Sequence, residues 1–213
     1  VLLPRIIFYR VSFLKAVRIC AHGGIDQLRY EDADEPQLRS ANDVIVKLTA
    51  AAINRSDLPH RAGVGCGTNM TSRIPGADGA GIVLSVGTGV RHIRAGDAVC
   101  LYPIYGCGDC RFCAGEQEAL CSEQRLLGER DDGTYAEYVR VPATHCFPVP
   151  TGLSFEEAAA FPLVYVTAWR MLTTQANLKP GESIWIVGAG GGGATPALPL
   201  AAALGGRVIG SSR

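Results

Sequence analysis

The chain has 213 residues, in which twenty Lys and Arg balance twenty Asp and Glu. Charged residues make up 19% and apolar residues 47% of it, which excludes a disordered tail and a basic nucleic-acid-binding protein. This length predicts one or two domains with a core that needs no disulfide bonds. Glycine is frequent, at 26 residues, which indicates tight turns or backbone held close to a ligand.

Two apolar stretches are candidates for targeting or membrane segments. Residues 1–14 are interrupted by Pro4, Arg5 and Arg10, so they match neither a signal peptide nor a spanning helix, and we expect an N-terminal extension. The uncharged stretch 183–206 holds four consecutive glycines and two prolines, which suit a buried turn better than a lipid-facing helix. We therefore expect a cytoplasmic protein without a membrane or nucleic-acid partner.

Residues 15–150 consist of short β-type runs separated by turns rich in Gly and Asp. This is the pattern of an all-β barrel or sandwich. The expected strands are Lys15–Cys20, Val44–Ala52, Gly81–Val86, Ala98–Tyr102, Tyr135–Val141 and His145–Val149.

Residues 151–213 differ in composition, since only seven of them are charged. The Ser154–Glu157 segment has the form of a capping box, in which the serine and glutamate side chains bond each other's backbone amides. It predicts a helix from Phe155 that is interrupted near Pro162 and ends near Gln175.

A strand–turn–helix–strand pattern follows this helix. Ser183–Val187 is apolar throughout, as in a parallel strand covered on both faces, and a glycine-rich turn comes after it. Residues 194–204 are expected to be helical, and Arg207–Gly210 to form a second strand. Pro199 falls inside the expected helix, where it predicts a kink or a later helix start.

Four cysteines, Cys107, Cys110, Cys113 and Cys121, have the spacing C-x2-C-x2-C-x7-C within a polar lobe at residues 106–122. Zinc prefers four tetrahedral thiolates, and two-residue gaps let turns present successive sulfur atoms to one point. The bacterial iron–sulfur pattern has three residues before its last cysteine and proline after it, so it does not fit. We expect one structural zinc, which four thiolates leave without an open position for catalysis.

The glycine-rich turn is a candidate dinucleotide site. Gly188, Gly190 and Gly193, with Gly191 between them, satisfy G-x-G-x-x-G between an expected strand and an expected helix. In that context backbone amides and the helix dipole can hold a pyrophosphate. The alternative is a flexible glycine tract that binds nothing.

The cofactor preference is predicted from the end of the second strand. An NAD site places Asp or Glu there for the ribose hydroxyls, whereas this chain has Ser212 and Arg213. A guanidinium in place of a carboxylate favours a 2′-phosphate, so we expect NADP(H) to be preferred over NAD(H).

Together these features resemble the medium-chain dehydrogenase/reductase superfamily, which includes zinc-type alcohol dehydrogenases and quinone-reductase-like proteins. The resemblance implies a β-rich GroES-like barrel over residues 15–150, as the catalytic domain. It also implies an α/β Rossmann domain, a doubly wound parallel sheet, of which 151–213 supply the linker helix and first βαβ unit. Such a fold uses about six strands, so we expect a C-terminal truncation. The matching stretches are Ala51–Asp57, Ile74–Gly81, Ala95–Val99, the cysteine lobe, Ala159–Ala168 and the glycine turn.

Zinc alcohol dehydrogenases also hold a catalytic zinc. The resemblance places its three ligands at Asn54, Ala77 and Leu163, none of which is the expected thiolate or imidazole, so we expect no catalytic zinc. A replacement metal site stays an alternative. Its candidate ligands are His60, Cys66, Asp57 and Asp78.

Without a zinc ion to polarise a carbonyl, a conjugated enone or a quinone is the better hydride acceptor. The resemblance implies that Asn54 and Ser56 face the substrate as hydrogen-bonding groups. It further implies that Arg55 meets the cofactor phosphates and that Thr167 lies on the nicotinamide side. Asp57 is either a catalytic candidate or a structural carboxylate paired with an arginine.

The sequence thus predicts an NADPH-dependent, zinc-independent reductase acting on a small activated carbonyl or quinone, and a possible homodimer in the full-length protein. Two alternatives stay open. One is a zinc-dependent alcohol dehydrogenase with an atypical metal site, and the other is an inactive zinc-stabilised fragment.

Overall fold

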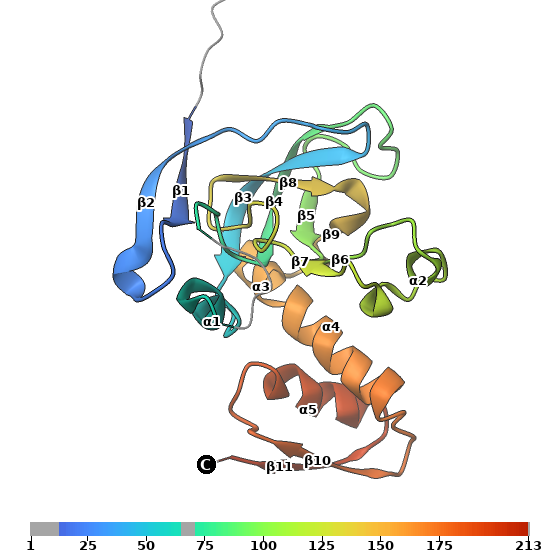
Figure 1. Cartoon of the computed structure of the whole chain (residues 1–213). Coiled ribbons are helices and arrows are strands. Elements are labelled where there is room, and N and C mark those ends of the chain that lie inside the picture. Colours follow the sequence, from blue (N-terminus) through green and yellow to red (C-terminus); the bar gives the residue numbers. More distant parts are fainter. Residues whose placement is uncertain (1–12, 65–70, 213) are drawn as a thin grey trace, which may run out of the picture.

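The computed structural model describes residues 13–64 and 71–212. A β-rich part runs from β1 to β9, and a smaller α/β part follows it; helices α3 and α4 connect the two (Figure 1). No helix among the described residues is long and apolar enough to cross a membrane.

The β-rich part is built on a five-stranded antiparallel sheet in the order β8-β3-β4-β5-β9. Its strands are β3 (Asp43–Ala52), β4 (Asp78–Val86), β5 (Ala98–Leu101), β8 (Tyr138–Pro142) and β9 (Cys146–Pro148). The remaining strands form two antiparallel pairs, β1 (Phe13–Ile19) with β2 (Leu28–Asp34) and β6 (Ile104–Tyr105) with β7 (Arg125–Leu126). Among the described residues β8 and β9 do not pair, so the expected barrel is an open sheet.

One face of this sheet carries the main apolar core. Val44 and Val46 on β3, Val83 on β4 and Leu101 on β5 are at most 1% exposed. These residues are mostly β-branched, which fits a buried pleated surface. The opposite face carries small residues, Ala80 and Cys100, against which helix α3 packs (Figure 1).

Helix α3 (Phe155–Ala160) and helix α4 (Pro162–Arg170) are separated at Phe161, as the sequence predicted. The capping box is confirmed, because the Glu157 amide donates to Ser154 Oγ over 3.2 Å and the Ser154 amide donates to Glu157 Oε2 over 2.8 Å. A five-residue π-helical segment, Met171–Gln175, extends α4. This segment leads directly into the α/β part.

The α/β part contains β10 (Ser183–Val187), helix α5 (Ala194–Ala203) and β11 (Arg207–Ser211). The two strands pair in parallel, as expected for a βαβ unit, and α5 packs between them and α4 (Figure 1). The helix starts at Ala194 and includes Pro199, so the later helix start that the proline allowed does not occur.

The prediction that Ser183–Val187 is covered on both faces is wrong for this structure. Trp185 and Val187 on β10 and Ile209 on β11 are 67%, 71% and 57% exposed, because α5 covers only the other face. An apolar run cannot by itself tell which of its faces the rest of the chain covers.

Several short elements were not predicted. They include strands β2, β6 and β7, helix α1 (Asp57–Ala62), helix α2 (Arg111–Ala114) and the 3₁₀ turns at Ile25–Gln27, Glu118–Leu120 and Ala143–His145. The first strand also begins earlier than expected, since Phe13 and the buried Leu14 belong to β1 rather than to an extension.

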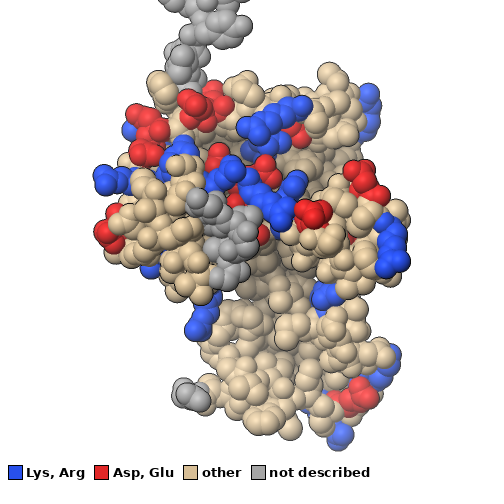
Figure 2. Space-filling view, viewed as in Figure 1, with Lys and Arg blue, Asp and Glu red and all other residues tan. Residues whose placement is uncertain are grey.

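Charge is distributed unevenly over the surface. Figure 2 shows the Lys, Arg, Asp and Glu residues gathered mainly on the β-rich part, while the α/β part is largely uncharged on this face. Positive and negative groups are mixed, so this face has no extended basic surface for nucleic acid.

Candidate functional site

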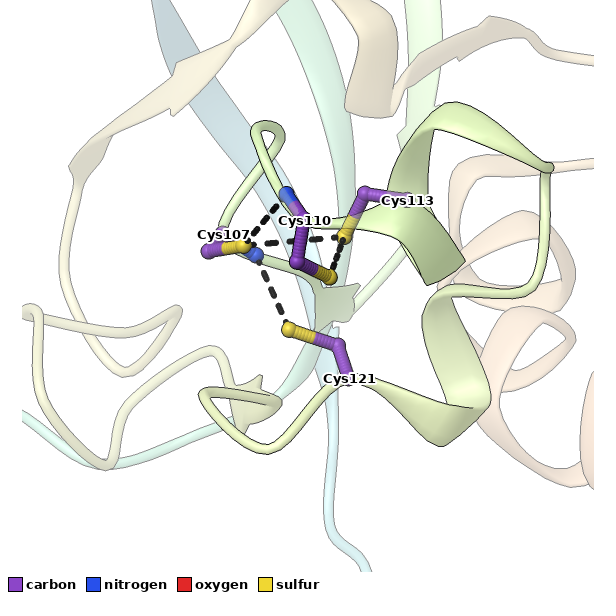
Figure 3. A group of neighbouring side chains, drawn as sticks. All are labelled: Cys107, Cys110, Cys113 and Cys121. Carbon is purple, nitrogen blue, oxygen red and sulfur yellow. Dashed lines mark hydrogen bonds between the residues drawn. The ribbon is translucent and has the colours of Figure 1, made fainter.

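The cysteine lobe brings its four thiols to one point (Figure 3). Cys107 precedes helix α2, Cys110 caps it, Cys113 lies within it, and Cys121 follows the 3₁₀ turn at Glu118–Leu120. Their four Sγ atoms all lie within 4.8 Å of one another. Gly106 is needed beside them, because a Cβ there would meet Cys113 Sγ at 2.5 Å.

The spacing of the sulfur atoms fits a tetrahedral zinc ion. Zn–S bonds of about 2.3 Å place neighbouring sulfurs about 3.8 Å apart. The Cys107–Cys113 and Cys110–Cys113 sulfur pairs are separated by 3.9 and 3.6 Å. Backbone amides of Cys107 and Cys110 donate to the sulfurs of Cys121 and Cys107, each over 3.3 Å. Such bonds stabilise thiolates in the form that binds metal.

A cleft of 1070 Å³ lies between the β-rich part and the α/β part. Residues 52–56, at and just after the end of β3, line one side of it. Helices α3 and α4 line the second side, and the glycine-rich turn lines the third. Of the predicted site residues, Asn54, Arg55, Ser56, Thr167, Gly188, Gly191 and Gly193 line this cleft. Segments more than a hundred residues apart in the chain therefore meet in one cavity.

The glycine-rich turn is open toward a ligand. Gly188 has a φ of 77°, a left-handed conformation that favours glycine, and its carbonyl accepts from the Gly191 amide. A Cβ built at Gly188, Gly190 or Gly193 meets nothing within 4 Å. Helix α5, ten residues long, starts directly after Gly193. This open backbone before a helix N-terminus fits the pyrophosphate of a dinucleotide.

The residues predicted to select NADP(H) follow β11. Ser211, the last residue of β11, accepts hydrogen bonds at its carbonyl from the amides of Gly188 and Ala189, so the exposed Ser212 lies beside the glycine turn. Ser212 is not among the described residues that line the cleft. Arg213 lies outside the described residues.

Asn54 is held at both its backbone and its side chain. Its amide nitrogen donates to Asp57 Oδ2 over 2.7 Å, and the same carboxylate oxygen accepts a hydrogen bond from the Tyr135 hydroxyl. The Asn54 side-chain nitrogen donates to Asp78 Oδ2 over 2.9 Å. Asp57 does not line the cleft, and its carboxylate is bonded to Tyr135 and Asn54 rather than paired with an arginine.

Asp78 is the buried charged group of this site, at 1% exposure on β4. Its second oxygen, Oδ1, accepts from the Leu163 amide in the first turn of α4 over 3.0 Å. Burial raises the pKa of Asp78 to about 6; the hydrogen bonds from Asn54 and Leu163 oppose that rise, and the charge of Asp57 adds to it. The sequence suggested Asp78 as a candidate ligand of a replacement metal site, and it did not reveal these contacts.

Ser56 presents an unpartnered hydroxyl. Its Oγ is buried and has no hydrogen-bond partner in the structure. Ser56 is one of the residues that line the cleft, and a buried hydroxyl ordinarily has a hydrogen-bond partner. Arg55 and Thr167 are both exposed residues of the cleft wall.

Of the positions expected for catalytic zinc ligands, Asn54 and Leu163 each donate a hydrogen bond to the Asp78 carboxylate, and Ala77 precedes Asp78 in the chain. Within residues 13–64 and 71–212, the four lobe cysteines are the one group of three or more His, Cys, Asp or Glu that could hold a metal. His60 instead pairs with Glu129 over 3.2 Å, and Cys66 lies outside the described residues.

Comparison with known proteins agrees with this fold. The family model "Alcohol dehydrogenase GroES-like domain" matches residues 40–151. An alcohol dehydrogenase of Geobacillus stearothermophilus is 36% identical over 183 residues, 85% of this chain and 53% of the relative. Crotonyl-CoA carboxylase/reductase of Cereibacter sphaeroides is 34% identical over 203 residues, 92% of this chain and 47% of the relative.

A solved structure of an NAD-dependent alcohol dehydrogenase superposes with a TM-score of 0.87 at 38% identity, covering 93% of this chain and 57% of that one. The chain therefore belongs to the medium-chain dehydrogenase/reductase family and carries its GroES-like domain, followed by the start of a Rossmann-like unit. It spans about half the length of the curated relatives it matches.

Proposed function

We propose that the protein is an NADPH-dependent oxidoreductase that reduces a quinone or a conjugated enone without a catalytic zinc, and that the cysteine lobe binds one structural zinc. The observation that carries the proposal is the cleft, in which Asn54 and Ser56 lie opposite an open glycine turn. The name of the relative "Crotonyl-CoA carboxylase/reductase" supports a conjugated substrate, because a crotonyl group has a carbon–carbon double bond next to its carbonyl.

The residues present fit a nicotinamide dinucleotide. The turn from Gly188 to Gly193 and the N-terminus of α5 would hold the pyrophosphate, Arg55 would contact phosphate, and Thr167 would lie on the nicotinamide side of the cleft. The preference for NADP(H) rests on Ser212 and Arg213 in place of a carboxylate. The bound cofactor supplies a hydride to the substrate.

The chain's own contribution is orientation and charge stabilisation. Hydride addition to a conjugated carbonyl places negative charge on its oxygen, which a hydrogen-bond donor in a water-poor cleft stabilises. The Ser56 hydroxyl, buried and without a partner, can donate to that oxygen. Hydrogen bonds to Asp57 and Asp78 fix Asn54 in the cleft wall, so its side-chain amide is a second polar group with a defined position.

The test is NADPH oxidation by the zinc-loaded chain with a panel of quinones, enones, aldehydes and alcohols. The proposal predicts turnover with a quinone or enone that persists in a chelator at a concentration shown by zinc analysis to leave the lobe zinc in place. Chelator-sensitive oxidation of alcohols would favour the atypical zinc enzyme instead. A chain that binds neither NADPH nor NADH would support the inactive fragment.

Ser56→Ala is the matched probe of the cleft. Removing one oxyanion donor costs roughly a hundredfold in kcat, so we expect a loss of that order. Ser85→Ala, on β4 and outside the cleft, is the control and should leave kcat unchanged. Equal activity of both variants would remove Ser56 from the mechanism.

We also propose a cytoplasmic location, a small-molecule substrate and a homodimeric full-length protein. These rest on the composition and on the family rather than on a particular contact. Sedimentation of the natively expressed protein and fractionation of the cell check them.

A further inference from the structure

We infer that Asp78 is a positioning residue that sets the orientation of the Asn54 amide, turning the nitrogen away from the ligand toward β4 and leaving the oxygen to the cleft. This inference rests on the proposed function, because it assigns Asn54 its part in ligand recognition. It goes beyond that function in stating which polar atom of Asn54 the ligand meets.

Both carboxylate oxygens of Asp78 accept a hydrogen bond. An ionised carboxylate only accepts hydrogen bonds, so each neighbour must present an N–H to it. Asn54 Nδ2 lies 2.9 Å from Oδ2, and the Leu163 amide lies 3.0 Å from Oδ1. A flipped Asn54 would place its oxygen against Oδ2, where two acceptors would repel each other.

Asn54 has little freedom to leave this arrangement. Its residue is 8% exposed, and its backbone amide is bonded to the Asp57 carboxylate, which the Tyr135 hydroxyl holds in turn. The backbone amide and one of the two side-chain N–H groups are committed, and the oxygen Oδ1 is the acceptor that Asn54 can offer to the cleft it lines.

In this orientation Asn54 and Ser56 offer the ligand different hydrogen-bonding groups. Asn54 accepts a hydrogen bond from an N–H or O–H of the ligand, whereas Ser56 keeps a hydroxyl free to donate. The same carboxylate also bonds the first turn of α4, which carries Thr167 farther along. Asp78 therefore connects two walls of the cleft through one buried group.

The orientation of the Asn54 amide depends on pH through Asp78. The ionisable groups that act on Asp78 or are acted on by it are Asp57, Tyr135 and Cys100; none of them is cationic at neutral pH. None of these three groups offsets the effect of burial, which raises the pKa of Asp78 to about 6. Once protonated, Asp78 can donate a hydrogen bond to Asn54 Oδ1. At low pH the Asn54 side-chain amide can therefore bond to Asp78 in either orientation.

Asp78→Asn tests the inference directly. The Leu163 amide still requires an oxygen acceptor, so the new side chain turns its nitrogen toward Asn54, which must then present its oxygen. The Asn54 amide flips, and its nitrogen faces the cleft.

The first measurement is nuclear magnetic resonance of the Asn54 side-chain amide in the isotope-labelled chain, assigned by its loss in Asn54→Ala. We expect its signals to titrate with Asp78, near pH 6, and to shift without that titration in Asp78→Asn. Signals that stay the same in folded Asp78→Asn would overturn the inference. This measurement needs no turnover, so it decides the orientation even if the proposed function fails.

The second measurement is a double-mutant cycle in kcat/KM with the zinc-loaded chain. If Asp78 acts through Asn54, Asp78→Asn lowers kcat/KM about tenfold in the native background and less than about twofold in Asn54→Ala. Equal losses in both backgrounds would show that Asp78 acts independently of Asn54 and would overturn the positioning role. Asp34→Asn, at an exposed position on β2, serves as the control without effect.

Discussion

Replacing the buried Asp78 by Asn should make the protein more stable at neutral pH. The pKa of this carboxyl is raised by burial from 3.8 to about 6, and the side chain is 1% exposed, so solvent screens it little. When folding raises the pKa of an acid, the native state binds more protons than the unfolded state at pH values between the unfolded and the native pKa. Stability therefore falls as the pH rises from about 4 to about 6 and stays lower above it.

The size of the effect follows from the shift. About two pKa units correspond to about 3 kcal/mol of unfolding free energy at pH 8, relative to a neutral side chain at this place. We expect Asp78→Asn to gain up to that amount at pH 8 and almost nothing at pH 4.

Urea unfolding of both chains across this pH range measures the difference, with Asp34→Asn as the exposed control. A difference that does not grow with pH would refute the reasoning, and so would a loss of stability at pH 8. A gain would mean that the native chain accepts a less stable fold in order to keep an ionised group beside Asn54, as functional sites often do.

Further predictions concern metal, cofactor and core. Cys110→Ser should abolish stoichiometric zinc binding and lower the melting temperature, because three thiolates no longer close the tetrahedron; unchanged zinc content would contradict this. Arg213→Ala should reduce the preference for NADPH over NADH about tenfold in kcat/KM, whereas Arg207→Ala, on β11, should not; equal effects would remove Arg213 from cofactor selection. Gly188→Ala should weaken NADPH binding in a calorimetric titration, since a φ of 77° strains any other residue, and unaltered affinity would argue against the turn as the phosphate site. Leu101→Ala, at 0% exposure, should cost about 2 to 5 kcal/mol of unfolding free energy in urea, and a loss below about 1 kcal/mol would mean that the core there repacks.

Features defined by local chemistry were predictable from the sequence. The capping box at Ser154 and Glu157 is confirmed because its bonds join residues three apart. The cysteine spacing likewise specifies a turn that brings sulfurs together, and the structure has that turn. The strand–turn–helix–strand pattern after residue 182 gave the parallel pair correctly.

Features that depend on distant contacts were not predictable. Strand β2 (Leu28–Asp34) is rich in charged residues, and it becomes a strand because it pairs with β1 rather than because its own pattern favours one. The role of Asp78 rests on partners 24 and 85 residues away, which no local pattern reveals. The exposed face of β10 depends in the same way on what packs against it.

The zinc content of the purified, zinc-saturated chain tests the central claim most directly. One zinc ion per chain, removed by substitution of Cys110 and retained in Asn54→Ala, is the result expected for a scaffold with a structural metal and a metal-free reaction cleft. Two ions per chain, with one lost on altering Asn54, would place a metal in the cleft and contradict the account.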